Sequence, residues 1–145
     1  MWSSDTLFAL EQRHLAQLAL WSGASFALGM LLLVLLRACR AEAPLVTHFA
    51  LQMTLWGAGE LLLTALWWRE LAARDFAGAV RLTSYLRLAI GAEVGCLALG
   101  ATLAVAGWTL TRKLAVLGAG AAVVVQCAAL LALDTWLLAR MAGAA

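Results

Sequence analysis

Four long apolar stretches constrain the fold of this chain more than any other feature of its sequence. They cover residues 15–36, 46–68, 84–107 and 114–138. Each approaches or exceeds the roughly 20 residues that a helix needs to cross about 30 Å of hydrocarbon. Hydrocarbon offers no water to the backbone, so such stretches must be helical. Because the connections are short, we predict an all-α, integral membrane four-helix bundle of up-down-up-down topology, with one domain over residues 1–145.

The composition agrees with a membrane location. Of the 145 residues, 65% are hydrophobic and only 12% are charged, and the mean hydropathy is +0.93. Soluble domains are about half apolar and about a quarter charged. We therefore expect the lipid bilayer to be the surroundings of the chain. The formal net charge is only +2 and no basic block occurs, which argues against nucleic acid as a partner.

Arginine placement gives a weak indication of orientation. Both termini and the 69–83 loop share one side of the predicted bundle, called the terminal side below. Six arginines lie on or near this side, against three arginines and one lysine on the opposite side. Basic residues concentrate in the cytoplasm, so this bias favours cytoplasmic termini, although the charges that flank the first span favour the reverse. The excess of arginine over lysine fits a GC-rich bacterial gene, and we expect the bacterial inner membrane.

Two residues mark the starts of predicted helices. Pro44 suits the first turn of the second helix, because a backbone N–H at that position would have no partner within the helix. Asp75 can cap the third helix by accepting a hydrogen bond from its first turn.

The second span carries polar residues at regular spacing. His48, Gln52, Trp56 and Glu60 follow one another four residues apart and form one stripe. An ionisable residue at mid-span costs roughly 2.5–3.5 kcal/mol, whereas a leucine contributes only about 0.3–0.6 kcal/mol. The stripe is therefore expected to face protein or a wet cavity instead of lipid.

Acidic residues on three spans converge on the terminal half of the membrane. At 1.5 Å per residue, Glu60 and Glu93 lie roughly 12–13 Å inside the terminal side, and Asp134 lies about 7 Å inside it. Gln52 and Gln126 lie deeper, at comparable levels. We predict an intramembrane polar cluster of His48, Gln52, Glu60, Glu93, Gln126 and Asp134.

Two interpretations of this cluster remain open. Interhelical hydrogen bonds and ion pairs hold membrane bundles together, and Arg87 or Arg140 is placed to pair with Asp134. No arginine or lysine is predicted at the depth of Glu60 and Glu93, so these two carboxyls can share a proton. A shared proton makes a strong hydrogen bond, and it also makes a proton or cation site.

The third span contains the motif GAEVG, in which Gly91 and Gly95 have the GxxxG spacing. Glycines at this spacing allow close backbone approach between membrane helices. They lie nearly opposite Glu93 around the helix, so we expect one face to pack by glycine and another by the carboxyl. A homodimer contact through the glycines is a further hypothesis.

No cofactor, metal site or catalytic constellation is predicted. The two histidines, His14 and His48, lie near opposite membrane surfaces, roughly 30 Å apart, which excludes bis-histidine haem within one chain. No Glu-x-x-His pattern, phosphate loop or metal-spaced set of cysteines occurs. We therefore expect the protein not to be an enzyme.

Three segments carry a resemblance to a known family. They are HFALQMTLWGAGELLLTALWW, LRLAIGAEVGCLALGATL and VVVQCAALLALDTWLL, and the similarity covers the second to fourth spans, roughly residues 46–139. They resemble a family of small four-helix bacterial membrane proteins of unknown function. The similarity rests on the His-x-x-x-Gln start of the second span, the acid followed by small residues in the third, and Gln126 with Asp134. It implies a four-helix fold and no particular activity.

Two functional hypotheses follow from these patterns. The favoured one is a non-catalytic membrane subunit or scaffold, held together by its polar strip and docked on itself or on a larger membrane complex. The alternative is a small proton- or cation-coupled carrier or channel that uses Glu60 and Glu93.

Overall fold

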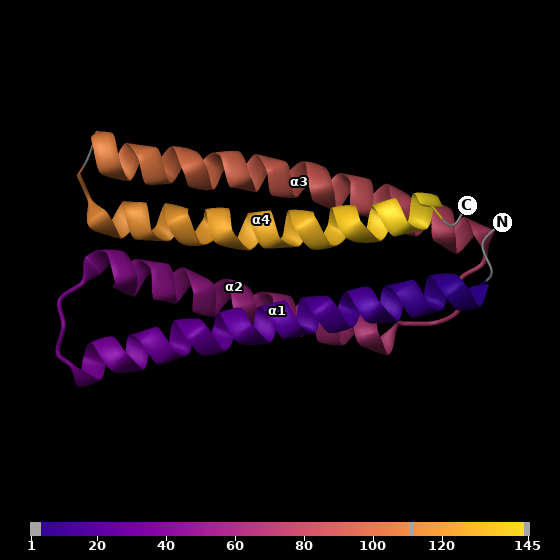
Figure 1. Cartoon of the computed structure of the whole chain (residues 1–145), viewed down its shortest axis with the longest axis horizontal. Helices are drawn as coiled ribbons and strands as arrows, with labels where there is room; N and C mark the ends of the chain where they lie inside the picture. Colours follow the sequence, from indigo (N-terminus) through magenta and orange to yellow (C-terminus); the bar gives the residue numbers. More distant parts are fainter. Residues whose placement is uncertain (1–3, 111, 144–145) are drawn as a thin grey trace.

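The structure, a computed structural model, is an all-α bundle of antiparallel helices (Figure 1). It describes residues 4–110 and 112–143. The four helices are α1 (Ser4–Ala38), α2 (Pro44–Arg69), α3 (Phe76–Thr109) and α4 (Leu114–Gly143), and no strand occurs in the described ranges. Each predicted span lies inside one of these helices. The predicted fold class is confirmed.

The helices pack as two hairpins, α1 with α2 and α3 with α4. Figure 1 shows α2 and α4 next to each other between the outer helices α1 and α3, which lie farthest apart at the end that carries the tight turns. The hairpins meet chiefly where α2 packs on α4, with a smaller contact between α1 and α4, whereas α2 and α3 do not pack along their lengths. At the terminal side a cluster of buried apolar side chains joins α1, α3 and α4: Leu7, Leu86, Leu137 and Met141.

The predicted helix starts are confirmed at both positions. Pro44 lies in the first turn of α2. Asp75 caps α3, because its Oδ1 accepts a hydrogen bond from the backbone N–H of Gly78 at 2.7 Å. The two tight turns each place an arginine, Arg40 and Arg112, in the left-handed backbone region, with φ of 49° at both. The same turn conformation thus ends both hairpins on the side opposite the termini.

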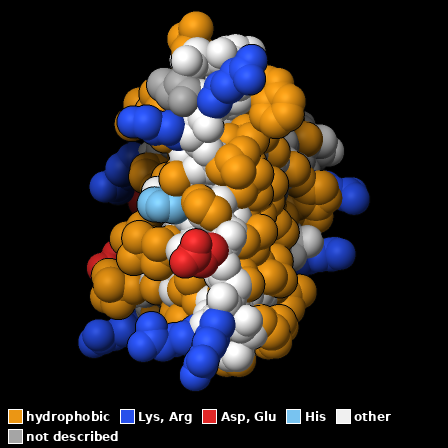
Figure 2. All heavy atoms as spheres, turned by 90° about the vertical axis from the view of Figure 1, so that its left-hand side faces the viewer, with side chains coloured by type: hydrophobic (Ala, Val, Ile, Leu, Met, Phe, Trp, Pro, Cys, Tyr) orange, Lys and Arg blue, Asp and Glu red, His pale blue; other side chains and the backbone are white. Residues whose placement is uncertain are grey.

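All four helices are long and apolar enough to cross a membrane. Figure 2 shows the end of the molecule that carries the two tight turns, with hydrophobic side chains over much of the surface and basic side chains round its edges. This distribution suits a bundle with its sides in lipid and its ends at the headgroups, where long arginine side chains can reach water. The length and composition of the four helices therefore suit a membrane protein.

The glycine contacts within the chain differ from the predicted ones. A Cβ added to Gly91 or Gly95 would meet no heavy atom within 4 Å, so these glycines face away from the rest of the protein. The close approach of α3 and α4 uses Gly100 and Gly120 instead, because a Cβ on Gly120 would lie 2.7 Å from the carbonyl oxygen of Gly100. The predicted packing through Gly91 and Gly95 is therefore wrong within one chain. The motif lies about half a turn away from the face that α4 covers.

Candidate functional site

A cavity of about 120 Å³ lies between the two hairpins in the terminal half of the bundle. All four helices line it. Its acidic side chains are Glu60 from α2, Glu93 from α3 and Asp134 from α4. The three acids predicted to converge thus reach one interior space, called the inner cavity below.

A polar contact links α1 and α4 at this cavity. Nε2 of His14 on α1 lies 3.1 Å from Oδ1 of Asp134, and both residues are buried. Glu93 on α3 lines the same cavity as Asp134. Its Oε2 is buried and has no hydrogen-bond partner among the described residues.

Glu60 makes its contact on the other wall, with α1. Its Oε2 lies 3.3 Å from the hydroxyl oxygen of Ser22, which also donates to the backbone carbonyl of Leu18 at 2.6 Å. The Glu60 residue is 9% exposed, and its Oε1 has no hydrogen-bond partner among residues 4–110 and 112–143. An unpartnered oxygen on an acid this deeply buried is energetically costly, because burial removes it from water without replacement.

Gln126 forms a separate contact deeper in the membrane. Its side-chain carbonyl accepts a 2.7 Å hydrogen bond from Nε1 of Trp21 on α1. Its amide nitrogen lies 3.4 Å from the sulfur of Met53 on α2. Gln126 is fully buried, so these contacts tie α1, α2 and α4 together above the inner cavity.

A comparison with protein families gives a match that runs from Gln17 in α1 to Thr135 in α4. The matching family is described as a family of unknown function, DUF6992. The chain belongs to DUF6992. No curated protein and no solved structure matches it significantly. The predicted resemblance is thus confirmed, and the matched range includes Glu60, Glu93 and Asp134 but not His14.

In this DUF6992 protein the ion pairs differ from those predicted. Asp134 pairs with His14, not with Arg87 or Arg140. Arg87 is exposed on α3, and the guanidinium of Arg140 lies over the ring of Trp136, 5.5 Å from its centroid. The reason is that α1 continues to Ser4, so its first turns pack on the end of α4 and bring His14 beside Asp134.

The inward face of α2 also differs from the predicted stripe. The buried residues of this helix are Ala50, Met53, Gly57, Glu60 and Thr64, which alternate steps of three and four. Residues spaced only four apart drift about 40° per step, so His48 lies about 120° around the helix from Glu60. His48 is exposed, and its predicted place in the polar cluster is wrong.

Gln52 lies next to the inward face without belonging to it. It is half-buried and lines an open surface groove on α2, together with Trp56, Gly59 and Glu60. Gln126 therefore meets Met53 and not Gln52.

Several residues of the site in this DUF6992 protein were not predicted. They are Trp21 and Ser22 on α1 and Thr64 and Tyr85 near the cavity, together with the role of His14. One signal was available: Ser22 and Ser25 interrupt an apolar span three residues apart, and both are buried. Nothing in the sequence indicated that Tyr85 lines the cavity, because its position depends on how the two hairpins pack together.

The described residues contain no group of three or more His, Cys, Asp or Glu side chains placed to hold a metal ion. The three acids surround the inner cavity without converging on one point. The arrangement is suited to holding protons on separate carboxyls more than to chelating a metal.

Proposed function

We propose that this protein is a small proton-coupled membrane carrier or channel of the bacterial inner membrane, in which Glu60 and Glu93 bind the proton. The observation that carries the proposal is the inner cavity, which carboxyls from three helices line together. Ionisable residues inside membrane helices are expensive, and those that face a bundle interior commonly mark ion or proton pathways.

Hydrogen-bond stoichiometry supports a proton as the bound species. The hydroxyl of Ser22 has one hydrogen, and the carbonyl of Leu18 lies at the shorter distance. When that carbonyl takes the hydrogen, only a protonated Glu60 can complete the contact between Glu60 and Ser22. Oε1 of Glu60 and Oε2 of Glu93 are both buried without a hydrogen-bond partner among the described residues, and a buried oxygen in this position costs less on a neutral carboxyl than on a charged one.

The arrangement supports a relay with two stations. A proton would bind first at Glu93 and Asp134, where His14 holds the aspartate in place. It would then pass across the inner cavity to Glu60 on α2. The arginine excess supports a cytoplasmic location for the terminal side, on which the first station lies.

Proton flux across liposomes tests this function. We expect the purified protein to dissipate an imposed pH gradient, measured with a dye trapped inside the vesicles. Glu60→Gln and Glu93→Gln are each expected to reduce the flux to that of empty liposomes, because the amide keeps the shape of the side chain but cannot release a proton.

The matched control is Glu42→Gln, since Glu42 is exposed in the turn on the opposite side. It should leave the flux unchanged. Wild-type protein that gives no flux above empty liposomes would overturn the proposal, as would full flux in both cavity variants. Circular dichroism establishes that each variant is folded.

A non-catalytic membrane subunit is the second candidate, and the outer face of α3 favours it. Among the major helix contacts α3 packs only on α4, and Gly91 and Gly95 are exposed on its other side. Exposed glycines four residues apart leave a shallow surface on which a second membrane helix can pack closely. The partner would be a second copy of this chain or a larger complex.

This second candidate predicts a dimer that depends on the glycines. We expect Gly95→Leu to raise the dissociation constant of the dimer roughly tenfold, because the bulky side chain keeps the helices apart. Native mass spectrometry at several protein concentrations measures it. Gly23→Leu is the control, because Gly23 also has open space around it but lies on α1. A chain that stays monomeric at every concentration argues against the candidate.

A further inference from the structure

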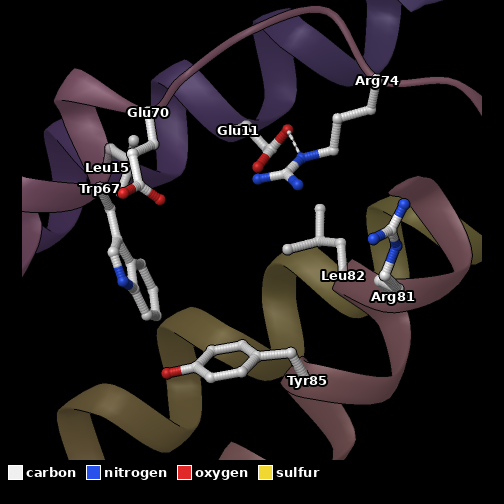
Figure 3. A pocket seen from close by; sticks show the side chains of 8 residues that line it. All are labelled: Glu11, Leu15, Trp67, Glu70, Arg74, Arg81, Leu82 and Tyr85. Carbon is white, nitrogen blue, oxygen red and sulfur yellow. Dashed lines mark hydrogen bonds and ion pairs between the residues drawn. The ribbon is translucent and has the colours of Figure 1, made fainter.

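A second cavity, of about 260 Å³, lies beside the inner cavity at the terminal side (Figure 3). It is called the outer pocket below. Its charged side chains come from α1, from the α2–α3 connection and from the first turns of α3, and they are Glu11, Glu70, Arg74 and Arg81. Two acids and two arginines balance each other in formal charge, and apolar and aromatic side chains complete the lining.

One side of the outer pocket is fixed by an ion pair. Nε of Arg74 donates to Oε2 of Glu11 at 2.7 Å, and this contact is visible in Figure 3. The hydrogen bond with Glu11 raises the pKa of Arg74 above its ordinary value. Arg74 thus stays charged at physiological pH, and its hydrogen bond to Glu11 ties the α2–α3 connection to α1.

Two aromatic side chains are shared by the outer pocket and the inner cavity, and both are partly exposed. Trp67 on α2 and Tyr85 on α3 line both spaces. Their ring centroids are 5.0 Å apart and their planes lie at 78°, an edge-to-face contact. Figure 3 shows the indole of Trp67 extending toward the Tyr85 ring. Because α2 and α3 do not pack along their lengths, this contact is a side-chain bridge between helices that are otherwise apart.

We propose that the outer pocket is the entrance through which water and protons reach the inner cavity, and that Trp67 and Tyr85 are the gate that closes it. This inference rests on the proposed proton-coupled function. The order of groups gives a route: hydrated charges outside, then the two rings, then Glu93 and Asp134. Either ring can leave the contact by side-chain rotation alone, which requires no helix to move.

The accessibility of a cysteine in the inner cavity tests the gate. Ala89 lines the inner cavity but not the outer pocket, so Ala89→Cys reports access from outside. The three native cysteines are first replaced (Cys39→Ser, Cys96→Ala and Cys127→Ala). The probe is a membrane-impermeant methanethiosulfonate carrying a trimethylammonium group, added separately to each side of oriented vesicles.

We expect reaction from the terminal side, and a rate about tenfold higher in Trp67→Ala or Tyr85→Ala, the change expected when one aromatic contact is lost. Tyr85→Phe keeps the ring, so Ala89→Cys should react in this variant at the same rate as in the parent. This variant also carries little risk to folding. The matched control is Trp68→Ala, since Trp68 is the neighbouring exposed indole and lines neither cavity.

The outcome separates the gate from the proposed function, because thiol labelling does not depend on proton flux. Faster labelling in the gate variants without any flux in the liposome assay would support the gate and overturn the proposed function. Equal labelling rates in the parent, Trp67→Ala and Tyr85→Ala would overturn the gate, and so would labelling from the opposite side alone.

Discussion

Replacement of His14 by leucine is expected to lower the free energy of unfolding by about 3 kcal/mol. His14 and the Asp134 that it contacts at 3.1 Å are both buried. Loss of the imidazole leaves a carboxyl without its partner in the low-dielectric interior. This value is at the upper end of the usual cost of losing a hydrogen bond to a charged group. It is at the lower end of the cost of losing one member of a buried ion pair. Denaturant unfolding in detergent micelles, followed by circular dichroism, measures the change.

The double variant His14→Leu/Asp134→Leu makes this prediction specific. Replacement of both partners by apolar residues removes the unpaired group, so most of the lost stability should return. Arg13→Leu is the control, because Arg13 is an exposed neighbour whose guanidinium lies over the ring of Trp136 at 5.4 Å. It should cost less than about 1 kcal/mol. A His14→Leu effect as small as that of the control would show that the pair does not stabilise the bundle.

Replacement of Gly57 by alanine is expected to separate α1 from α2 and to lower the free energy of unfolding by about 1–3 kcal/mol. A Cβ at Gly57 would lie 2.6 Å from the backbone nitrogen of Phe26 and 2.7 Å from the carbonyl oxygen of Ser22. Both are backbone atoms, so relief requires a movement of the whole helix. That movement also draws Ser22 away from Glu60, and we therefore expect proton flux to fall as well.

Gly59→Ala provides the matched control on the same helix. A Cβ at Gly59 meets nothing within 4 Å, and alanine is the better helix former. This variant should unfold at the same denaturant concentration as the wild type, or slightly higher. If Gly57→Ala and Gly59→Ala prove equally stable, the close crossing of α1 and α2 at Gly57 does not exist in the membrane.

The helices themselves were predictable because the bilayer sets both their length and their hydrogen bonding. Each predicted span falls within one observed helix, and the helix starts at Pro44 and Asp75 follow from local chemistry. The observed helices overshoot the spans mainly at the terminal side. There α1 includes additional turns that carry Glu11 and His14, which lie before the apolar stretch.

The depth of each polar residue in the membrane was predictable, but the direction in which its side chain points was not. Depth depends only on residue count, and Glu60, Glu93 and Asp134 do line one cavity. Direction depends on which face of each helix its neighbours cover. For α2 that face runs through Met53, Gly57 and Glu60, which leaves His48 exposed. Spacing in the sequence could not distinguish this face from one rotated by a third of a turn.

Residue counts alone predict four helices long enough to span a membrane, with three acids in the terminal half, because rise per residue and hydrocarbon thickness are fixed quantities. The partners of the polar side chains depend on the tertiary structure: His14 for Asp134, Ser22 for Glu60, and Trp67 with Tyr85 beside both cavities. These pairings join different helices, so they depend on the crossing and rotation of whole helices, which glycines such as Gly57 set by allowing close backbone contact.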